Sequence, residues 1–434
     1  MLTEQTCYQV TSPLHFCRAV ETFDPDVFFI IDHLRAEFAD VLPENLPILT
    51  WDQDQLPHVI TRDNLLKMAP HDFLVGCSKK PCVKLGADPR QVRLSLVPTC
   101  PEEFGGDSLT EAERERFACD VSFVSHASQT PSAFHEEETR GVKDDLLRRL
   151  MNELFALVPG MLAEHHMMSG YVASVILEQA MARCGIRALP VEVEARLKDW
   201  YLWRLSDRIF RHQALEWAAN WARRRNRALR IYGNGWDKHP TLAPFAAGPA
   251  RNGRELVCVH RASRINLQLM PAGFLHQRAM DGLAAGGFFL TRRTDRDMTG
   301  RALRTLMTRI DQLGLRDTAS LVNSDDPAVR AGLNVVLGPW LEHMHRASED
   351  ALGYLRITAE VPFPDELFPR FDEIVFDSAA SFEAAADRFV DDESERQSTA
   401  AEMREILIRD LSYIPTMQRF LSWMRDYLVE RAAR

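Results

Sequence analysis

The sequence predicts an α/β protein made of two α/β units with helical insertions, and three observations support this prediction. Short apolar or β-branched runs alternate with helical stretches over the first 117 residues. The same alternation resumes at residue 229, after a long helical stretch that begins near residue 136. The chain has 434 residues, which is more than one hydrophobic core usually accommodates, so two or three domains are expected.

The first unit is predicted from four brief runs bounded by Pro, Asp and Gly, as buried parallel strands tend to be. These expected strands are Asp26–Ile31, Pro47–Trp51, Phe73–Gly76 and Val92–Val97. A helix at Pro13–Thr22 precedes them. Since no strong strand opens the unit, either Tyr8–Thr11 is a weak first strand or the domain is abbreviated.

The second unit is predicted to open with the strand Asp120–Val124, followed by the helical stretch Glu136–Arg227. Its further strands are expected at 229–232, 265–269, 288–291 and 372–376. Helices are expected at 254–262, 277–285, 382–390, 393–411 and 415–433, and a second polar helical stretch from 297 to about 356.

Composition and charge restrict the kind of partner. The net charge of −10 argues against nucleic acid or an anionic membrane as the main partner. No segment approaches the roughly 18–20 apolar residues of a membrane span, and Met1–Val10 lacks the pattern of a signal peptide. A cytoplasmic protein is therefore expected.

The eight cysteines are scattered along the chain. The closest pair, Cys77 and Cys82, is not repeated at the spacing of a zinc site. Reduced, mostly buried thiols are expected in a cytoplasmic protein, and no metal site is predicted.

One candidate for ligand binding is the segment "RALRIYGNGWDKHP" at residues 227–240. Here a strand ends in Gly233-Asn234-Gly235-Trp236, and a Gly-x-Gly turn lets the backbone pass close to a bound group. The third glycine and the acidic partner of a dinucleotide fingerprint are missing. The turn alone therefore fits either a structural turn or one wall of a nucleotide site.

A second candidate is "FLHQRAMDGLAAGGFFLT" at residues 274–291. It predicts a helix with Arg278 and Asp281 on one face, followed by a small-residue end and a buried strand. The helix N-terminus can receive a phosphate, Arg278 can add a charge-assisted contact, and Asp281 suits a ribose hydroxyl. The alternative is an exposed ion pair between Arg278 and Asp281 worth a few tenths of a kcal/mol.

Together, "LRIYGNGW", "HRASRINLQL" and "HQRAMDGLAAGGFFLT" resemble the donor half of group 1-type glycosyltransferases of the GT-B fold, in particular the CgeB-like (spore maturation protein-like) branch. "CDVSFVSHAS" resembles the opening strand of that half. "PDVFFIIDH", "LPILTWDQDQLP" and "HDFLVGCS" resemble the acceptor-side half, and the tail resembles terminal helices that cross back to the first domain.

This resemblance implies a particular domain organisation. Residues 1–117 would form a Rossmann-like acceptor-side domain, and residues 118–410 a Rossmann-like domain that binds the nucleotide-sugar. The second domain would include the helical insertion at about 130–227. Residues 411–434 would form the helix that returns to the first domain.

The resemblance also implies roles for individual residues. Gly233, Asn234 and Gly235 would lie near the donor diphosphate with Trp236 beside them, and Asn266 would end a donor-side strand. His276, Gln277 and Arg278 would meet phosphate and sugar, and Asp281 stands where the ribose-binding acid of the family falls. A nucleotide-sugar would be the donor, a protein or glycan the acceptor, and no metal or other cofactor would be needed.

Catalysis in such an enzyme needs positive charge at the leaving diphosphate, and Arg278 is the first candidate for that role. Three further arginines are alternative candidates for this role: Arg251, Arg254 and Arg264. If the reaction inverts configuration, a base must take the acceptor proton. The candidate bases are Asp52 and Asp54, which follow a predicted strand, with His58 and His126 as alternatives.

Two departures from the family pattern favour a second interpretation. Gly273 stands at the position of the first of two glutamates found in related enzymes, and Arg292-Arg293 follow Thr291 where an acidic turn is usual. A scaffold that binds a sugar nucleotide without efficient catalysis fits these departures, and an epimerase of the same fold is a third alternative. The helical insertion is expected to pack beside the cleft or at a subunit interface.

Overall fold

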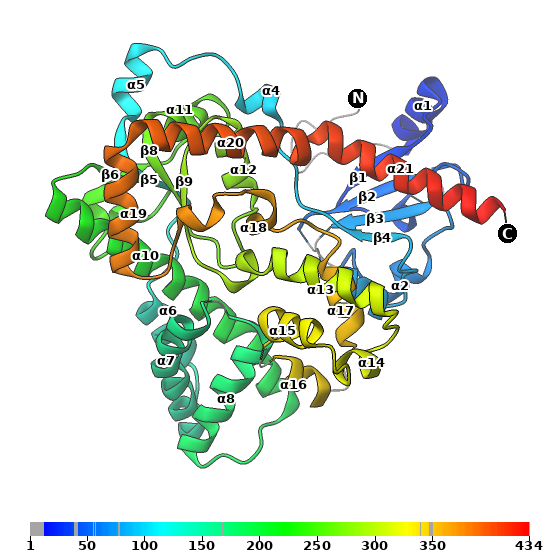
Figure 1. The fold of residues 1–434 in the computed structure, drawn as a ribbon, viewed down its shortest axis with the longest axis horizontal. Helices are drawn as coiled ribbons and strands as arrows, with labels where there is room; N and C mark the ends of the chain where they lie inside the picture. Colours follow the sequence, from blue (N-terminus) through cyan, green and yellow to red (C-terminus); the bar gives the residue numbers. More distant parts are fainter. Residues whose placement is uncertain are drawn as a thin grey trace.

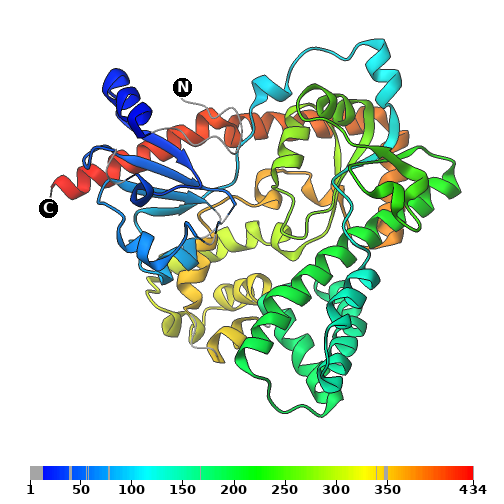
Figure 2. The ribbon, with the colours of Figure 1, turned by 180° about the vertical axis from the view of Figure 1, so that it is seen from behind.

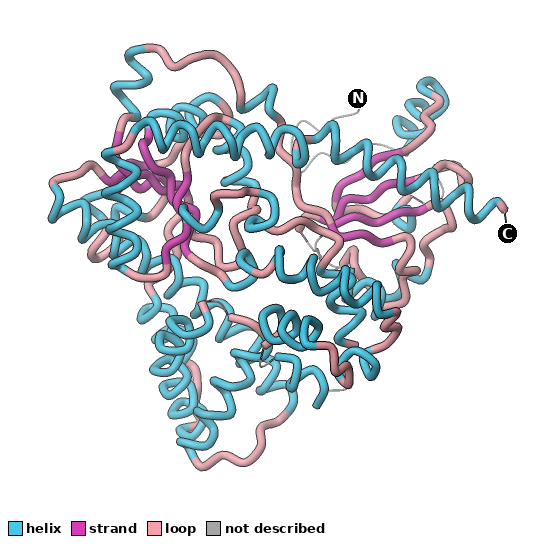
Figure 3. The backbone as a smooth tube through the Cα atoms, viewed as in Figure 1, coloured by secondary structure: helices cyan, strands magenta, loops and turns pink. Residues whose placement is uncertain are grey.

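The computed structural model describes residues 13–38, 42–54, 56, 58–76, 79–166, 168–338, 340–346 and 350–433. Their strands form two separate parallel sheets with helices around them (Figures 1 and 3). The prediction of an α/β protein with two Rossmann-like domains is thus confirmed. The proposed strand at Tyr8–Thr11 lies outside the described residues.

The first sheet has the order β1-β2-β3-β4, with all pairs parallel. Its strands are Phe28–Ile31, Ile48–Asp52, Asp72–Gly76 and Val92–Leu94. Because the strands follow each other in one direction across the sheet, the described part of this domain has no point where the strand order reverses. The helices that accompany these strands are α1 (Pro13–Phe23), α2 (Arg62–Leu66) and α3 (Lys79–Lys84).

The second sheet has the order β10-β9-β8-β5-β6-β7, and all its pairs are parallel. Its strands are β5 (Cys119–Val124), β6 (Leu229–Tyr232), β7 (Ala246–Gly248), β8 (Ser263–Gln268), β9 (Phe289–Arg292) and β10 (Val375–Phe376). The chain adds strands on one side of β5 and then returns to its other side. The strand order therefore reverses between β5 and β8, which is where open α/β sheets usually bind ligands.

The core of the second domain joins this sheet to helices on its faces. It includes buried residues of α12 (Gln277–Ala284), α19 (Ala379–Asp391) and α20 (Glu393–Leu411). Helix α11 (Arg254–Ala262) connects β7 to β8. Parallel strands require such crossovers, and the helices hide the apolar strand residues from water.

The helical insertion between β5 and β6 is divided into several helices with a core of their own. They are α6 (Pro131–Arg140), α7 (Asp145–His165), α8 (Gly170–Cys184), α9 (Val191–Ala195), a π-helical segment (Arg196–Leu202) and α10 (Trp203–Arg225). Leu205 and Ile209 of α10 belong to the insertion core, whereas Leu215 and Trp221 belong to the core under the second sheet. Helix α10 thus fixes the insertion, which projects away from both sheets in Figures 1 and 2.

A second group of helices follows β9 and has a separate core. It comprises α13 (Gly300–Leu313), α14 (Thr318–Val322), α15 (Pro327–Val336), α16 (Trp340–Arg346) and α17 (Ala351–Thr358). Helix α18 (Pro364–Leu367) follows, and its Leu367 packs against the core of the second domain. The ion pair of Lys79 with Glu360 connects this group to the first domain.

The two domains are connected twice, and the two connections touch. One passes through α4 (Pro101–Phe104) and α5 (Glu111–Phe117) to β5. The other leads from α20 into α21 (Tyr413–Ala432), which lies along the first sheet (Figure 1). The Thr99 N–H donates to the Leu411 carbonyl at 3.2 Å, and the Tyr413 N–H donates to the Thr99 carbonyl at 3.1 Å.

Several elements differ in extent from the prediction, among them two strands of the second sheet. Strand β7 is missed by the pattern because Ala246–Gly248 contains no β-branched or aromatic residue. The expected strand 372–376 is shorter, since Phe371–Ile374 form a 3₁₀ turn and only Val375–Phe376 pair with β9. None of the described helices is long and apolar enough to cross a membrane.

The contact between α21 and the first sheet gives a stability prediction. Trp423 is 7% exposed; its ring lies 5.2 Å from that of Phe73, and its Nε1–H donates to the Arg90 carbonyl at 3.1 Å. Trp423→Ala is expected to lower the free energy of unfolding by about 3–5 kcal/mol, measured by urea denaturation. Leu421→Ala, at a 45% exposed position on the same helix, is the matched control and should cost less than about 1 kcal/mol.

Candidate functional site

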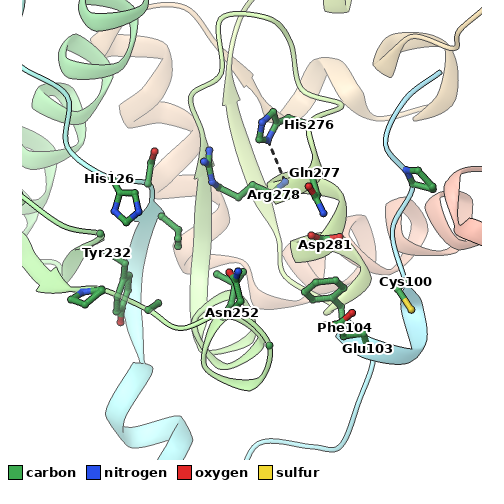
Figure 4. Close-up of a pocket in the computed structure, with 18 of the residues that line it drawn as sticks. Cys100, Glu103, Phe104, His126, Tyr232, Asn252, His276, Gln277, Arg278 and Asp281 are labelled. Carbon is green, nitrogen blue, oxygen red and sulfur yellow. Dashed lines mark hydrogen bonds between the residues drawn. The ribbon is translucent and has the colours of Figure 1, made fainter. Parts of the chain in front are cut away.

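A cavity of about 480 Å³ lies at the carboxyl ends of the strands of the second sheet (Figure 4). On the sheet side it is bordered by the end of β5, the end of β6, and the segments that lead into α11 and α12. On the other side it is bordered by Cys100, Glu103 and Phe104 of the first connection and by Tyr413 of the second. The cavity is therefore at the reversal of strand order and against the domain connections.

Two helix N-termini border this cavity. Helix α11 begins after Gly253 and α12 begins after His276, and both residues line the cavity. Each helix follows a parallel strand, so its first turn lies at the edge where the strands end. The unsatisfied N–H groups and the positive dipole end of a helix make this edge favourable for an anion.

Arg278 supplies a fixed positive charge at the same place. Its side chain lines the cavity, and among the described residues no carboxylate forms an ion pair with it. Burial, together with repulsion from Arg211, lowers the pKa of Arg278 to about 10, so the guanidinium stays charged at neutral pH. An anionic ligand would compensate this charge, which is costly to bury alone.

His276 is the N-cap residue of α12 and is neutral at physiological pH. Burial, with smaller repulsion from Arg278 and Arg211, lowers its pKa to about 4. The Arg278 backbone N–H donates to Nδ1 at 3.3 Å, the contact drawn in Figure 4. The ring proton therefore resides on Nε2, and His276 acts as a hydrogen-bond donor there.

Asp281 lines the cavity one turn further along α12. It is 6% exposed and accepts a hydrogen bond from the Thr99 hydroxyl at 2.8 Å. Burial raises the pKa of Asp281 to about 6; the Thr99 hydrogen bond lowers it, and the nearby Glu103 raises it. The described residues contain no ion pair between Arg278 and Asp281, so the alternative of an exposed ion pair is wrong.

The turn that leads into α12 is held by Asp297. Its two carboxylate oxygens accept from the Phe274 N–H at 3.1 and 2.9 Å, and one also accepts from the Thr294 hydroxyl at 2.8 Å. Gly273 has φ +122°, and a Cβ there would lie 2.7 Å from the Asp297 carboxylate. Position 273 consequently has no room for a glutamate side chain.

The Gly-Asn-Gly-Trp turn contributes less to the cavity than predicted. Gly233 borders the cavity, but Asn234 and Gly235 are not among the residues that line it. Trp236 is completely buried and donates from Nε1 to the Ser125 carbonyl at 2.7 Å. The indole packs against Phe123 inside the core and does not line the cavity, which disfavours its predicted contact with the donor.

Asn266 does not line the cavity either, which disfavours its predicted donor-site role. Asn266 is 2% exposed and its side chain is occupied inside the sheet. Its amide nitrogen donates to the carbonyls of His260 and Phe288, and its oxygen accepts from the Ser122 hydroxyl. The residue thus fastens β8 to its neighbours.

The structure does not bring Asp52 or Asp54 to the cavity. Asp52 is 2% exposed with both carboxylate oxygens buried, and the backbone of Gly76 packs against it. Asp54 is exposed beyond the end of β2, where its N–H donates to the Asp32 carboxylate at 3.2 Å. Neither aspartate fits the role of base at this cavity, and His58 does not line it either.

His126 lines the cavity, but its orientation disfavours the role of base. The Asn234 N–H donates to its Nδ1 at 3.0 Å, so the neutral ring bears its proton on Nε2. The free nitrogen is then a donor rather than a proton acceptor. His126 is therefore better suited to contact an oxygen of a ligand.

The three alternative arginines, Arg251, Arg254 and Arg264, do not line the cavity. Arg254 makes an ion pair with Glu113 at 2.7 Å, and Arg264 makes one with Asp120 at 3.0 Å. Arg251 is exposed at the end of the loop before α11. These ion pairs connect α11 to α5 and β8 to β5, so Arg254 and Arg264 have structural roles.

Several lining residues were not anticipated from the sequence: Cys100, Glu103, Phe104, Tyr232, Asn252 and Tyr413. Four of them come from the two domain connections, whose position depends on tertiary packing. The described residues contain no group of three or more His, Cys, Asp or Glu side chains that could hold a metal ion.

Comparison with known proteins gives little further information. No family model matches the chain, and no curated protein matches it. Among solved structures, it is similar to Anabaena HepE in complex with UDP and glucose, with 9% identity and a TM-score of 0.35. The similarity covers 95% of this chain and 82% of that chain. At this level the similarity supports no assignment of function.

The end of β6 gives a prediction about Gly233. This residue has φ +136°, and a Cβ there would lie 2.1 Å from the Ser125 carbonyl oxygen. Backbone strain of roughly 1–2 kcal/mol and overpacking of about 1–3 kcal/mol should together destabilise Gly233→Ala, measured by urea denaturation. Gly314→Ala, at φ +65° with no atom within 4 Å, should show the strain alone. Equal effects of the two substitutions would contradict the close packing.

The raised pKa of Asp281 gives a prediction about pH. The protonated carboxyl contributes stability that is fully present below about pH 4 and is lost as the pH rises through about 6. Asp281→Asn cannot ionise, and its amide oxygen can still accept from Thr99. It should exceed the wild type in unfolding free energy at pH 7.5 by up to about 3 kcal/mol, with the difference shrinking towards pH 4. A difference independent of pH would show that Asp281 does not titrate there.

Proposed function

We propose that the protein is a glycosyltransferase that transfers a sugar from a nucleotide-sugar to a protein or surface-glycan acceptor. The observation that supports this most is the position of Arg278. An arginine without a carboxylate partner among the described residues lines a cavity at the reversal of strand order, beside two helix N-termini. This combination suits a diphosphate.

In this proposal the donor lies across α12. The diphosphate contacts Arg278 and the first turn of α12, with His276 and Gln277 donating to phosphate or sugar oxygens. The ribose hydroxyls donate to Asp281, one turn further along the same helix. Gly233 and His126 border the remaining wall, at the ends of β6 and β5.

The chemistry required of the protein is mainly electrostatic. As the sugar carbon becomes oxocarbenium-like, negative charge accumulates on the departing nucleoside diphosphate. Arg278 and the helix dipole stabilise that charge, and they are most effective where water is excluded. The proposed transfer uses no metal.

A binding measurement tests this proposal. Isothermal calorimetry with UDP, GDP, ADP and dTDP should identify one diphosphate that binds. Arg278→Ala should weaken that binding roughly 10- to 100-fold, because one charge-assisted contact is worth about 1.5–3 kcal/mol. Arg278→Lys keeps the positive charge but loses the planar guanidinium. Its affinity for the diphosphate should lie between those of the wild type and Arg278→Ala.

Arg264→Ala is the matched control, since this arginine pairs with Asp120 and does not line the cavity. It should leave diphosphate affinity unchanged. Failure of all four diphosphates to bind would overturn the proposal, as would equal losses in Arg278→Ala and Arg264→Ala.

A second candidate is a scaffold that binds a sugar nucleotide without transferring the sugar. It is favoured by the positions of Asp52 and Asp54, which leave the cavity without either carboxylate expected to serve as base. Slow release of nucleotide from the matching nucleotide-sugar, lost in Arg278→Ala, would support the transferase. Binding without any turnover would support the scaffold, and interconversion of free nucleotide-sugars would indicate an epimerase.

The proposal also includes a cytoplasmic location and an oligomer formed through the helical insertion. The insertion carries large exposed apolar side chains at Val191 and Trp200, which suit a protein interface. Sedimentation of the intact protein and of Trp200→Glu tests the oligomer.

A further inference from the structure

A second cavity, of about 640 Å³, lies apart from the first and shares no lining residue with it. Its walls come from the helical insertion, from the segment after β9, from α13 and α15–α17, and from α3 and β4 of the first domain. The insertion helices and α13 to α17 lie in the lower half of the molecule in Figure 1 and again in Figure 2. The cavity is thus lined by parts of the chain that belong to separate cores.

The lining of this cavity is largely apolar. Aromatic side chains come from three directions: Tyr171 and Trp203 from the insertion, Trp340 from α16, and Tyr354 from α17. Trp203 is 39% exposed, and Val335 in the same lining is 57% exposed. Exposed apolar groups gathered around a cavity are typical of a site that holds an apolar ligand.

Positively charged side chains also line this cavity. Arg293 and Arg296 follow β9 and line it, as does Lys80; the one acidic residue in the lining is Asp295. Asp295 lies 3.6 Å from Arg293, whereas Arg296 is exposed and has no ion pair among the described residues. The lining therefore bears a net positive charge beside an apolar chamber.

A hydrogen-bond donor is also available there. The indole Nε1 of Trp340 is buried and has no acceptor within the described residues. A buried N–H without an acceptor destabilises the protein, and an anionic oxygen would satisfy it. The volume of about 640 Å³ falls within the range of pockets that bind small molecules.

We propose that the second cavity is a binding site for an amphipathic anion, a molecule with an apolar body and one negatively charged group. The aromatic and aliphatic lining holds the apolar body, and Arg296, Arg293 and the Trp340 indole hold the charged group. The site does not depend on nucleotide binding at the first cavity.

The fluorescent anion 8-anilinonaphthalene-1-sulfonate is the probe for this site. It should bind the intact protein saturably, with one site per chain, and a nucleoside diphosphate should not displace it. Arg296→Ala should weaken the binding roughly tenfold by removing one charge contact. Val335→Asp should weaken it similarly, because a carboxylate then faces the anion.

The control variant is Arg316→Ala, which removes an exposed arginine outside the lining. It should bind the probe as the wild type does, and circular dichroism should show that all three variants are folded. Unchanged affinity in both Arg296→Ala and Val335→Asp would overturn the proposal. Displacement of the probe by a nucleoside diphosphate would place it in the first cavity and overturn the proposal too.

Competition with three ten-carbon compounds tests the charge and distinguishes the sources of the ligand. Decyl phosphate displacing the probe better than decanoate indicates a phosphate group, and the reverse order indicates a carboxylate. Decanol has the same chain length but no charge. If decanol displaces the probe as well as both anions do, the requirement for a charged group is overturned. If the wild-type protein binds the probe but none of the nucleoside diphosphates, the result would contradict only the proposed transferase and not this second site.

Discussion

All strand pairs of the second sheet are parallel, and this constraint determines where the rest of the domain can place a ligand. A chain that makes parallel strands must leave each strand at one edge and return to the opposite edge through a crossover. The first turns of the crossover helices therefore collect where the strands end. Arg278, His276 and Gly253 lie near one another for this reason, although α11 and α12 are separate helices.

The same constraint explains why the molecule tolerates such a long insertion. The crossover from β5 to β6 has to leave the sheet at the ligand-binding edge, and additional helices inserted there do not disturb strand pairing. Helix α10 then returns to the sheet, with Leu205 in one core and Trp221 in the other. The insertion is consequently built beside the functional edge, where it also forms part of the second cavity.

Local patterns predicted the elements well, because strands and helices follow from runs of apolar residues and their spacing. The helix with Arg278 and Asp281 was recognised in this way, and both side chains line one cavity. Trp236 was misplaced because a Gly-x-Gly-Trp pattern does not say which face of the turn the indole occupies. Asp52 was misplaced because its position at a strand end predicts only that it lies at the edge of the sheet. The pattern does not show that the backbone of the neighbouring Gly76 packs against it and that its side chain is buried. Glu103 and Tyr413 could not be found, since the contact of the two domain connections is set by tertiary packing.

The paired connections at Thr99 also limit how the two domains can move. A change in the angle between the sheets must bend the chain at both connections, and these are hydrogen-bonded side by side through Thr99, Leu411 and Tyr413. The axis of such a rotation must pass close to this point. Asp281 accepts its hydrogen bond from Thr99, so its carboxylate lies almost on the axis. A rotation about this axis would carry the first sheet through a large arc while leaving this carboxylate nearly stationary.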